Sequence, residues 1–362
     1  MSSNEVERRK AEHLRVVAKG EVESHAGPGW ADVHLVHEAL PRTDAERVDL
    51  SVEFLGRRLN APLAIAAMTG GHAAGRSVNA RLAAAARRHG LAMGLGSQRA
   101  ALRNPELAGT YRVARETAPD AFLIANIGAA QLVAQERESP LSPEQAGELV
   151  AMVSADALAI HLNFLEETVQ PEGDRRVAGL RSALAAVVVS LPVPAIAKET
   201  GAGLSRPTAQ ELAAIGFKAL DVGGRGGTSF AAVEAVRAGE RGDQRRQALG
   251  QLFREWGIPT AASVVAAAST GLPVIATGGV RTGLDAAKAL ALGASLVGVA
   301  RPLLLAALEG EEALDTWICQ FLEELRVAVF LTGGARVSDL RSVPRVIMGE
   351  MRAWLEAMDA QS

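Results

Sequence analysis

Eight short apolar runs recur along the chain, and the segments between them have the apolar spacing of helices. An apolar run without polar alternation is typical of a parallel strand that is buried on both faces. Eight strand and helix units over roughly 240 residues match the size of a (β/α)8 barrel. The sequence therefore predicts an α/β protein of the TIM-barrel type, with strands at Leu63–Ala67, Leu91–Leu95, Ala121–Ile127, Ala157–Ile160, Val193–Ala197, Ala219–Val222, Pro273–Ala276 and Ser295–Val299.

A doubly wound sheet is the alternative architecture. It requires a G-x-G-x-x-G turn after the first strand, whereas this chain has Met68-Thr-Gly-Gly71 there. We expect residues 1–60 to form an N-terminal extension that contributes to the substrate site, with a helix over 4–20 and a strand or hairpin at Val48–Phe54. Residues 61–310 should form the barrel, and residues 311–362 should form helices packed on it.

Composition excludes several classes of function. The formal net charge of −3, with acidic and basic residues mixed along the chain, argues against a nucleic-acid or membrane surface. The single Cys319 excludes an internal disulfide and a cysteine metal cage, as expected of a cytoplasmic protein. No apolar run approaches the length of a membrane span.

Polar or glycine-rich residues follow all eight predicted strands. In a barrel the loops at the carboxyl ends of the strands build the active site, so these residues are its candidates. They are Thr69, Gly70, Ser97, Gln98, Arg99, Asn126, His161, Asn163, Lys198, Glu199, Asp221, Thr228, Gly278, Gly279, Arg281, Ala300 and Arg301.

Two glycine-rich loops contain several of them, Asp221–Phe230 and Ala276–Arg281. Each follows an apolar run and opens a predicted helix. Bare backbone N–H groups at a helix start bind phosphate, although the glycines also suit turns with positive φ. The last two strand ends of a barrel are a common phosphate site. The pair of loops therefore indicates a phosphorylated cofactor.

Three further groups have two interpretations each. Lys198 can place its charge against an electron-rich ring, or pair structurally with Glu199 or Asp221. The acids Glu166 and Glu167 near Asn163 suit Mg²⁺, or form a solvated helix start. The cluster Arg9–His13 can bind a diphosphate, but charged runs usually face water.

The ordered combination of motifs resembles the type 2 isopentenyl-diphosphate isomerases over residues 5 to 340. The motifs are Arg9–His13, Asp32–Pro41, Met68–Gly71, Gly96–Arg99, Asn126–Gly128, His161–Asn163, Gln170–Asp174, Lys198–Gly201, Gly223–Ser229, Trp256–Thr260 and Gly278–Gly283. The resemblance implies a barrel that binds FMN and Mg²⁺ and interconverts isopentenyl and dimethylallyl diphosphate in isoprenoid biosynthesis. It also implies NADPH to reduce the flavin, and a cytoplasmic homo-oligomer, a tetramer or octamer.

The resemblance assigns roles residue by residue. FMN would contact Met68, Thr69, Gly70, Ser97, Asn126, Lys198, Gly223, Thr228, Gly278, Gly279, Arg281, Ala300 and Arg301. Substrate would contact Arg9, Lys10, His13, Ser97, Gln98, Arg99 and Glu166, and Glu167 would bind the metal. Lys198, Glu166, His161 and Asn163 would be catalytic.

The main departure from the family pattern is Glu166, which takes the place of a glutamine. Two close carboxylates resist double ionisation, so this position should tune the site. Thr277 and Phe230 replace a serine and a tryptophan.

Two other functions are possible. An FMN-dependent 2-hydroxy-acid oxidase needs a histidine after the sixth strand, where this chain has Asp221–Arg225. A non-catalytic flavin-binding protein would have no use for a diphosphate clamp.

Overall fold

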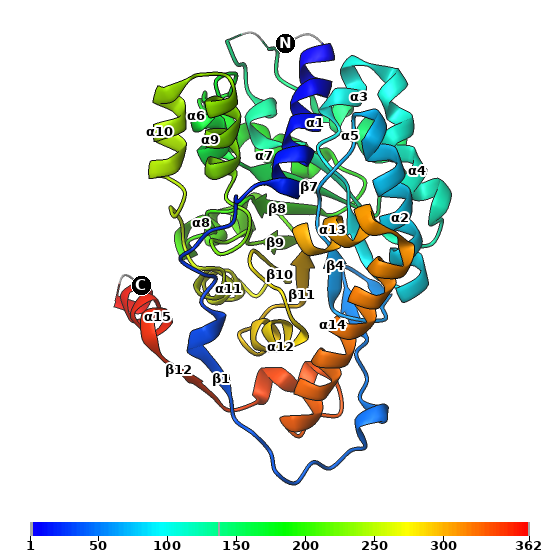
Figure 1. Cartoon of the computed structure of the whole chain (residues 1–362), viewed down its shortest axis with the longest axis vertical. Helices are drawn as coiled ribbons and strands as arrows, with labels where there is room; N and C mark the ends of the chain where they lie inside the picture. The colour runs from blue at the N-terminus through cyan, green and yellow to red at the C-terminus, as the bar shows by residue number, and fades with distance from the viewer. Residues whose placement is uncertain (1–2, 137, 361–362) are drawn as a thin grey trace.

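Eight parallel strands close into a barrel in the computed structural model, which describes residues 3–136 and 138–360. Each predicted apolar run overlaps one of the strands, so the predicted TIM barrel is confirmed. Each strand pairs with the next one along the chain, and the last strand pairs with the first to close the sheet (Figure 1). They are β4 (Leu63–Ile65), β5 (Ala92–Gly94), β6 (Phe122–Gly128), β7 (Ala157–Leu162), β8 (Ala195–Glu199), β9 (Ala219–Asp221), β10 (Val274–Thr277) and β11 (Leu296–Val299).

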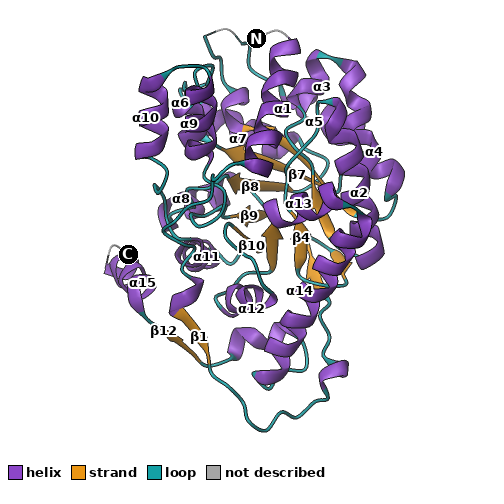
Figure 2. Cartoon of the chain, in the orientation of Figure 1, coloured by secondary structure: helices purple, strands orange, loops and turns teal. Residues whose placement is uncertain are grey.

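Helices surround the barrel and cover the outer faces of its strands (Figure 2). Their starts follow local chemistry: Ser142 and Gln145 form a capping box at one helix start, as Thr282 and Asp285 do at another, and such caps satisfy N–H groups that have no partner inside the helix. The outer helices are α2 (Ala73–His89), α4 (Gly109–Thr117), α5 (Pro143–Met152), α7 (Leu180–Ser190), α8 (Arg206–Ile215), α9 (Phe230–Glu240), α11 (Thr260–Ala268), α12 (Gly283–Ala291) and α13 (Arg301–Glu309). Three further helices lie in the loops: α3 (Arg99–Arg103), α6 (Phe164–Val169) and α10 (Gln244–Leu252).

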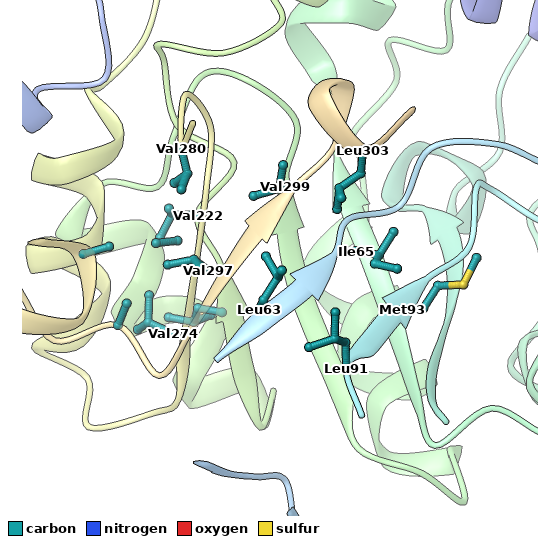
Figure 3. Packing of buried hydrophobic residues seen from close by; sticks show 14 of the residues in the cluster. Leu63, Ile65, Leu91, Met93, Val222, Val274, Val280, Val297, Val299 and Leu303 are labelled. Atoms are coloured by element: carbon teal, nitrogen blue, oxygen red, sulfur yellow. The ribbon is translucent and has the colours of Figure 1, made fainter. Parts of the chain in front are cut away.

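Side chains alternate between two buried layers along the strands, because successive residues of a strand point to opposite faces. Outward residues such as Leu63, Ile65, Val274 and Val297 pack against the helices (Figure 3). Inward residues form a separate cluster, to which the eight strands contribute Ala64, Ala92, Phe122, Ile124, Ala157, Ala159, Ile196, Ala219, Ile275 and Leu296. The many alanines therefore fit the narrow barrel interior.

A hairpin closes the amino-terminal end of the barrel. It consists of β2 (Val52–Phe54) and β3 (Arg57–Leu59), at the place where the sequence predicts a strand or hairpin. Phe54 and Leu59 belong to the inward cluster, and the Phe54 ring meets Phe122 edge to face at 5.8 Å between centroids. With this end filled, the open end is at the carboxyl termini of the strands.

The predicted N-terminal helix is present as α1 (Ser3–Lys19), which packs against α9, α13 and α3 (Figure 1). The C-terminal part contains α14 (Glu311–Leu331) and α15 (Gly349–Ala360). It also contains a short strand that the sequence does not signal, β12 (Arg345–Ile347), which pairs antiparallel with β1 (Val33–Leu35). A three-residue strand is too short for its periodicity to be recognised. Within the described residues, no helix combines the length and apolar character needed to span a bilayer.

Candidate functional site

Two adjoining cavities lie at the carboxyl ends of the strands. The larger, about 610 Å³, is bounded by α1, α3, α6 and the loop after α6. The smaller, about 170 Å³, lies between the strand ends and the two glycine loops. Both are lined by Ser97, His161, Glu166, Thr228 and Arg301, so ligands in the two cavities would be neighbours.

The floor of the smaller cavity is the next inward layer of the barrel. Two positions beyond the buried residues Ala159, Ile196 and Ala219, the strands carry polar residues that point the same way. In the strand register His161 is the partner of Lys198, and Lys198 is the partner of Asp221. Barrel geometry therefore brings these three side chains together, as their places at the predicted strand ends suggest.

Lys198 is buried and forms an ion pair with Asp221. Its Nζ lies 3.0 Å from Asp221 Oδ2 and donates to the backbone oxygen of Glu199 at 2.9 Å. The side chain lines the smaller cavity. Of the two expected acidic partners, Asp221 is the one that pairs, because Glu199 Oε2 instead accepts the backbone N–H groups of residues 200–203. Lys198 can thus hold a positive charge at the floor of the cavity.

His161 has a defined proton position. Asn126 donates its amide N–H to Leu95 O at 2.9 Å, so its Oδ1 is the acceptor 2.8 Å from His161 Nδ1. Burial, then the positive charges of Lys198, Lys10 and Arg9, lowers the pKa of His161 to about 3. The ring is therefore neutral near pH 7, with the proton on Nδ1 and a lone pair on Nε2.

We expect ¹⁵N spectra of histidine-labelled protein to show His161 as the neutral Nδ1–H tautomer from pH 5 to pH 8. The folded pKa of about 3 lies below this range, so lowering the pH to 5 should not protonate the ring. His161→Gln identifies the signal by removing it. Chemical shifts of a cationic ring at pH 5 or 6 would contradict the assignment.

The two glycine loops interlock through their backbones. A Cβ on Gly278 would lie 2.2 Å from Gly224 O, and one on Gly279 would lie 2.4 Å from Gly226 O. Both positions also have positive φ, 118° and 69°, which glycine adopts without strain. Side chains are thus excluded where the loops meet, and the backbone itself borders the smaller cavity.

The donors around this cavity suit a phosphorylated cofactor. Arg281 and Arg301 line it beside Gly278 and Gly279. Thr277 Oγ1 is buried and has no hydrogen-bond partner among the described residues, so it can serve a ligand. A residue at position 298 larger than glycine would strike that oxygen, at 2.1 Å. The donor set therefore fits a phosphate and the polar chain attached to it.

The N-terminal helix brings cations to the larger cavity, which Arg9, Lys10 and His13 line. Lys10 Nζ donates to Gly70 O at 3.0 Å and to the Tyr111 hydroxyl at 2.6 Å, and it also contacts Ser97 O. Burial, and then the charge of Arg9, lowers the pKa of Lys10 to about 7. An anion in the cavity would favour the charged form.

Arg99 also reaches the larger cavity, but acidic side chains hold it. Its NH1 lies 2.9 Å from Asp174 Oδ2 and its NH2 lies 3.1 Å from Glu138 Oε2. Charge-assisted contacts from two nitrogens to two separate carboxylates restrain the plane of the guanidinium. Arg99 is therefore oriented before any ligand arrives.

Glu166, Glu167 and Asn163 form one cluster on α6 and in the turn before it. The Asn163 amide nitrogen donates to Glu166 Oε2 at 2.9 Å and to Glu167 Oε1 at 3.2 Å. Burial, then the charges of Glu166 and Asp174, raises the pKa of Glu167 to about 7. Asn163 Oδ1 is buried without a partner among the described residues. Carboxylate and amide oxygens in one cavity wall are ligands that suit Mg²⁺.

Glu166 also belongs to a second cluster, with His13 and Glu234. Their potential ligand atoms lie within 4.8 Å of one another. His13 Nε2 is 2.6 Å from Glu234 Oε1, and Arg237 NH1 holds the other Glu234 oxygen at 2.5 Å. Burial, with Glu234 adding to it, raises the pKa of Glu166. This arrangement ties α1 to α9 behind the larger cavity.

Gln98, which the resemblance assigns to substrate binding, lies apart from the other substrate candidates. Gln98 is completely buried and lines neither cavity. Its Nε2 donates to Leu149 O at 3.0 Å, and its Oε1 accepts from Asn126 N at 2.9 Å. Its side chain therefore faces the protein interior and positions the strand that carries Asn126. Glu199 and Asp221 also lie outside both cavity linings, and the other predicted site residues line one cavity or both.

Several residues of the site carry no local sequence signal. Tyr111, Glu234 and Arg237 lie in helices that read as ordinary amphipathic segments, far in sequence from their partners on α1. Asp174 lies in the motif Gln170–Asp174, so attention to that motif could have identified it as a partner of Arg99.

Comparisons with known proteins show the family of the chain. A family model described as FMN-dependent dehydrogenase matches residues 7–105 and 204–345. Proteins named isopentenyl-diphosphate delta-isomerase are similar along nearly their whole length. The one from Methanoregula boonei is 49% identical and covers 96% of both chains. The one from Halobacterium salinarum is 47% identical, over 98% of this chain and 97% of the relative.

Solved structures with this fold include flavin oxidases. A lactate oxidase from Pediococcus acidilactici aligns with a TM-score of 0.65 at 15% identity, over 96% of this chain and 95% of the oxidase. A mandelate oxidase variant with (S)-mandelic acid aligns with a TM-score of 0.60 at 20% identity, over 96% of this chain and 99% of the other. At such identities the likeness shows the fold alone.

Proposed function

Because the chain belongs to the family of FMN-dependent isopentenyl-diphosphate delta-isomerases, we propose that its two cavities together convert isopentenyl diphosphate and dimethylallyl diphosphate into each other. One observation carries this proposal: a phosphate-type cavity with Lys198 at its floor shares a wall with a cavity that α1 lines with cations. The arrangement suits a flavin beside a diphosphate.

The smaller cavity would hold FMN. The phosphate would bind at the loops after the seventh and eighth barrel strands, a common phosphate site in barrels. The residues of these loops that line the cavity are Gly278, Gly279, Arg281 and Arg301. Lys198 would lie against the ring. Its paired, buried position supports this role, because a fixed charge in a site of low dielectric stabilises an anion strongly.

The larger cavity would hold the diphosphate. Arg9, Lys10 and Arg99 offer cations there, and Glu167 with Asn163 would hold Mg²⁺ against the phosphate oxygens. Fixing the diphosphate at one end orients the alkene at the other. His13 and Glu166 also line the larger cavity, where they would lie close to the bound substrate.

Moving a double bond requires a proton added at one carbon and a proton removed from a neighbour. When bound and reduced, FMN would supply a proton donor and acceptor near its N5, a chemistry that side-chain acids do not easily provide for an unactivated alkene. The chain would orient the alkene and exclude water. Lys198 would hold a positive charge, and neutral His161 would offer the lone pair of its Nε2. NADPH would be needed only to reduce the flavin, because isomerisation involves no net redox change. The proposal also includes a cytoplasmic homo-oligomer.

An anaerobic assay tests this function. Purified protein with FMN, NADPH, Mg²⁺ and isopentenyl diphosphate should form dimethylallyl diphosphate, with many turnovers for each NADPH oxidised. Omission of NADPH or chemical reductant is the control. Bound and reduced flavin without product would overturn the isomerase function.

The alternative of a 2-hydroxy-acid oxidase finds less support. Its histidine after the sixth barrel strand is absent here, where Asp221 pairs with Lys198 instead. A flavin-binding protein without turnover is also disfavoured, because Arg9, Lys10 and Arg99 line the cavity beside the flavin site. Oxidation of lactate or mandelate in a separate assay, with oxidised FMN under air and without NADPH, would favour the oxidase.

A further inference from the structure

Glu23 bridges the two arginines of the phosphate-type cavity. Its Oε1 lies 2.8 Å from Arg281 NH2 and 3.1 Å from Arg301 NH1. These arginines follow the seventh and eighth barrel strands and line the smaller cavity. One carboxylate oxygen therefore engages the terminal nitrogens of both.

The backbone around Glu23 is fixed to the first glycine loop. Ser24 N donates to Gly227 O at 2.8 Å, and Ser229 N donates to Val22 O at 2.7 Å. Glu23 itself forms a bridge with Thr228. These bonds use main-chain atoms only, so they hold Glu23 beside Arg281 and Arg301 without depending on its side chain.

The ion pairs themselves are accessible. The side chains retain 37% exposure for Glu23, 34% for Arg281 and 21% for Arg301. Ion pairs with this exposure are weak and exchange partners easily. A phosphate dianion offers more charge and more acceptor oxygens to the same guanidinium groups than one carboxylate does.

We propose that Glu23 is an internal counter-anion of the cofactor site, and that its carboxylate competes with the FMN phosphate for Arg281 and Arg301. This inference rests on the proposed function in taking FMN as the ligand. Glu23 thereby lowers the affinity for phosphorylated flavins. Arg301 Nε also donates to Val17 O of α1 at 2.8 Å. Phosphate would therefore replace the Glu23 carboxylate at a residue that also contacts α1, the helix that carries Arg9 and Lys10.

The experiment compares FMN with riboflavin, which lacks the phosphate, by fluorescence titration of the full chain freed of flavin. Glu23→Gln should bind FMN about five-fold more tightly, the scale of one partly exposed ion pair, and should bind riboflavin as the wild type does. Glu21→Gln is the matched control, since it removes the same charge from an exposed residue two positions away. It should leave both affinities unchanged.

Glu23→Asp keeps the charge but shortens its reach, so FMN should bind about three-fold more tightly, still on the scale of a weakened surface pair. This variant keeps the test valid if thermal melting shows that Glu23→Gln does not fold. Weaker FMN binding, unchanged FMN binding, or equal tightening of riboflavin would each overturn the counter-anion role. A wild-type chain that binds neither flavin would instead overturn the proposed cofactor site, and the counter-anion role with it.

Discussion

Replacing Lys198 with methionine lowers isomerase turnover by about 10³-fold at saturating substrate, the scale expected when a preorganised charge is removed from an active site. The same change lowers the free energy of unfolding by about 3 kcal/mol, because it leaves a buried Asp221 carboxylate without its partner. The two effects have different causes: one concerns the ligand that Lys198 faces, and the other concerns the ion pair at 3.0 Å.

A double variant separates these causes. In Lys198→Met with Asp221→Leu the orphaned charge is removed, and apolar replacement of a buried ion pair is often neutral. Stability should therefore return to near the wild-type value while turnover stays low. Urea unfolding and the anaerobic assay measure the two quantities. Wild-type turnover in either variant would exclude a catalytic role for Lys198.

Replacing Glu167 with glutamine abolishes specific Mg²⁺ binding and lowers turnover by about 10²-fold, since a metal clamp on phosphate oxygens contributes several kcal/mol to the transition state. The pKa of Glu167 is raised to about 7 by burial, Glu166 and Asp174. Only the ionised carboxylate binds the metal, so Mg²⁺ affinity of the wild type should fall about ten-fold per pH unit below pH 7 and level off above it. In the absence of metal, the stability associated with the neutral carboxyl is present at acid pH and is lost as the pH rises through about 7.

Glu166→Gln is the matched variant. It removes the neighbouring carboxylate, which is the second contributor to the raised pKa of Glu167, and it restores the residue of the family pattern. Mg²⁺ should then bind more tightly at pH 6, and the pH at which affinity levels off should move down. Calorimetric titration of Mg²⁺ with inorganic diphosphate at pH 6 and pH 8 measures both variants. Unchanged Mg²⁺ affinity in Glu167→Gln would show that Glu167 is not a ligand of the metal. Unchanged Mg²⁺ affinity at both pH values in Glu166→Gln would show that position 166 does not tune the site.

The sequence by itself determined the barrel and the end of it that carries the site. Strand and helix periodicity is a property of neighbouring residues. Each strand can therefore be predicted from its own apolar run, such as Leu63–Ala67, without information on the strands that pair with it. Once the strands are parallel and in order, the alternation of side chains places His161, Lys198 and Asp221 on one layer. The glycine loops were recognisable for the same reason, because their backbone conformation is local.

Only the tertiary structure decided which side chains meet across the chain. Lys10 reaches Tyr111, His13 reaches Glu234, and Glu23 reaches Arg281, over 101, 221 and 258 residues. Such contacts depend on how α1 and the segment after it cross the open end of the barrel, and no pattern within either segment encodes that crossing. The same holds for Gln98, whose polar side chain at a strand end looked like a ligand contact, although the fold turns it inward to hold Asn126. Secondary structure depends on consecutive residues, whereas the partners of a side chain depend on packing between segments that are far apart in the sequence.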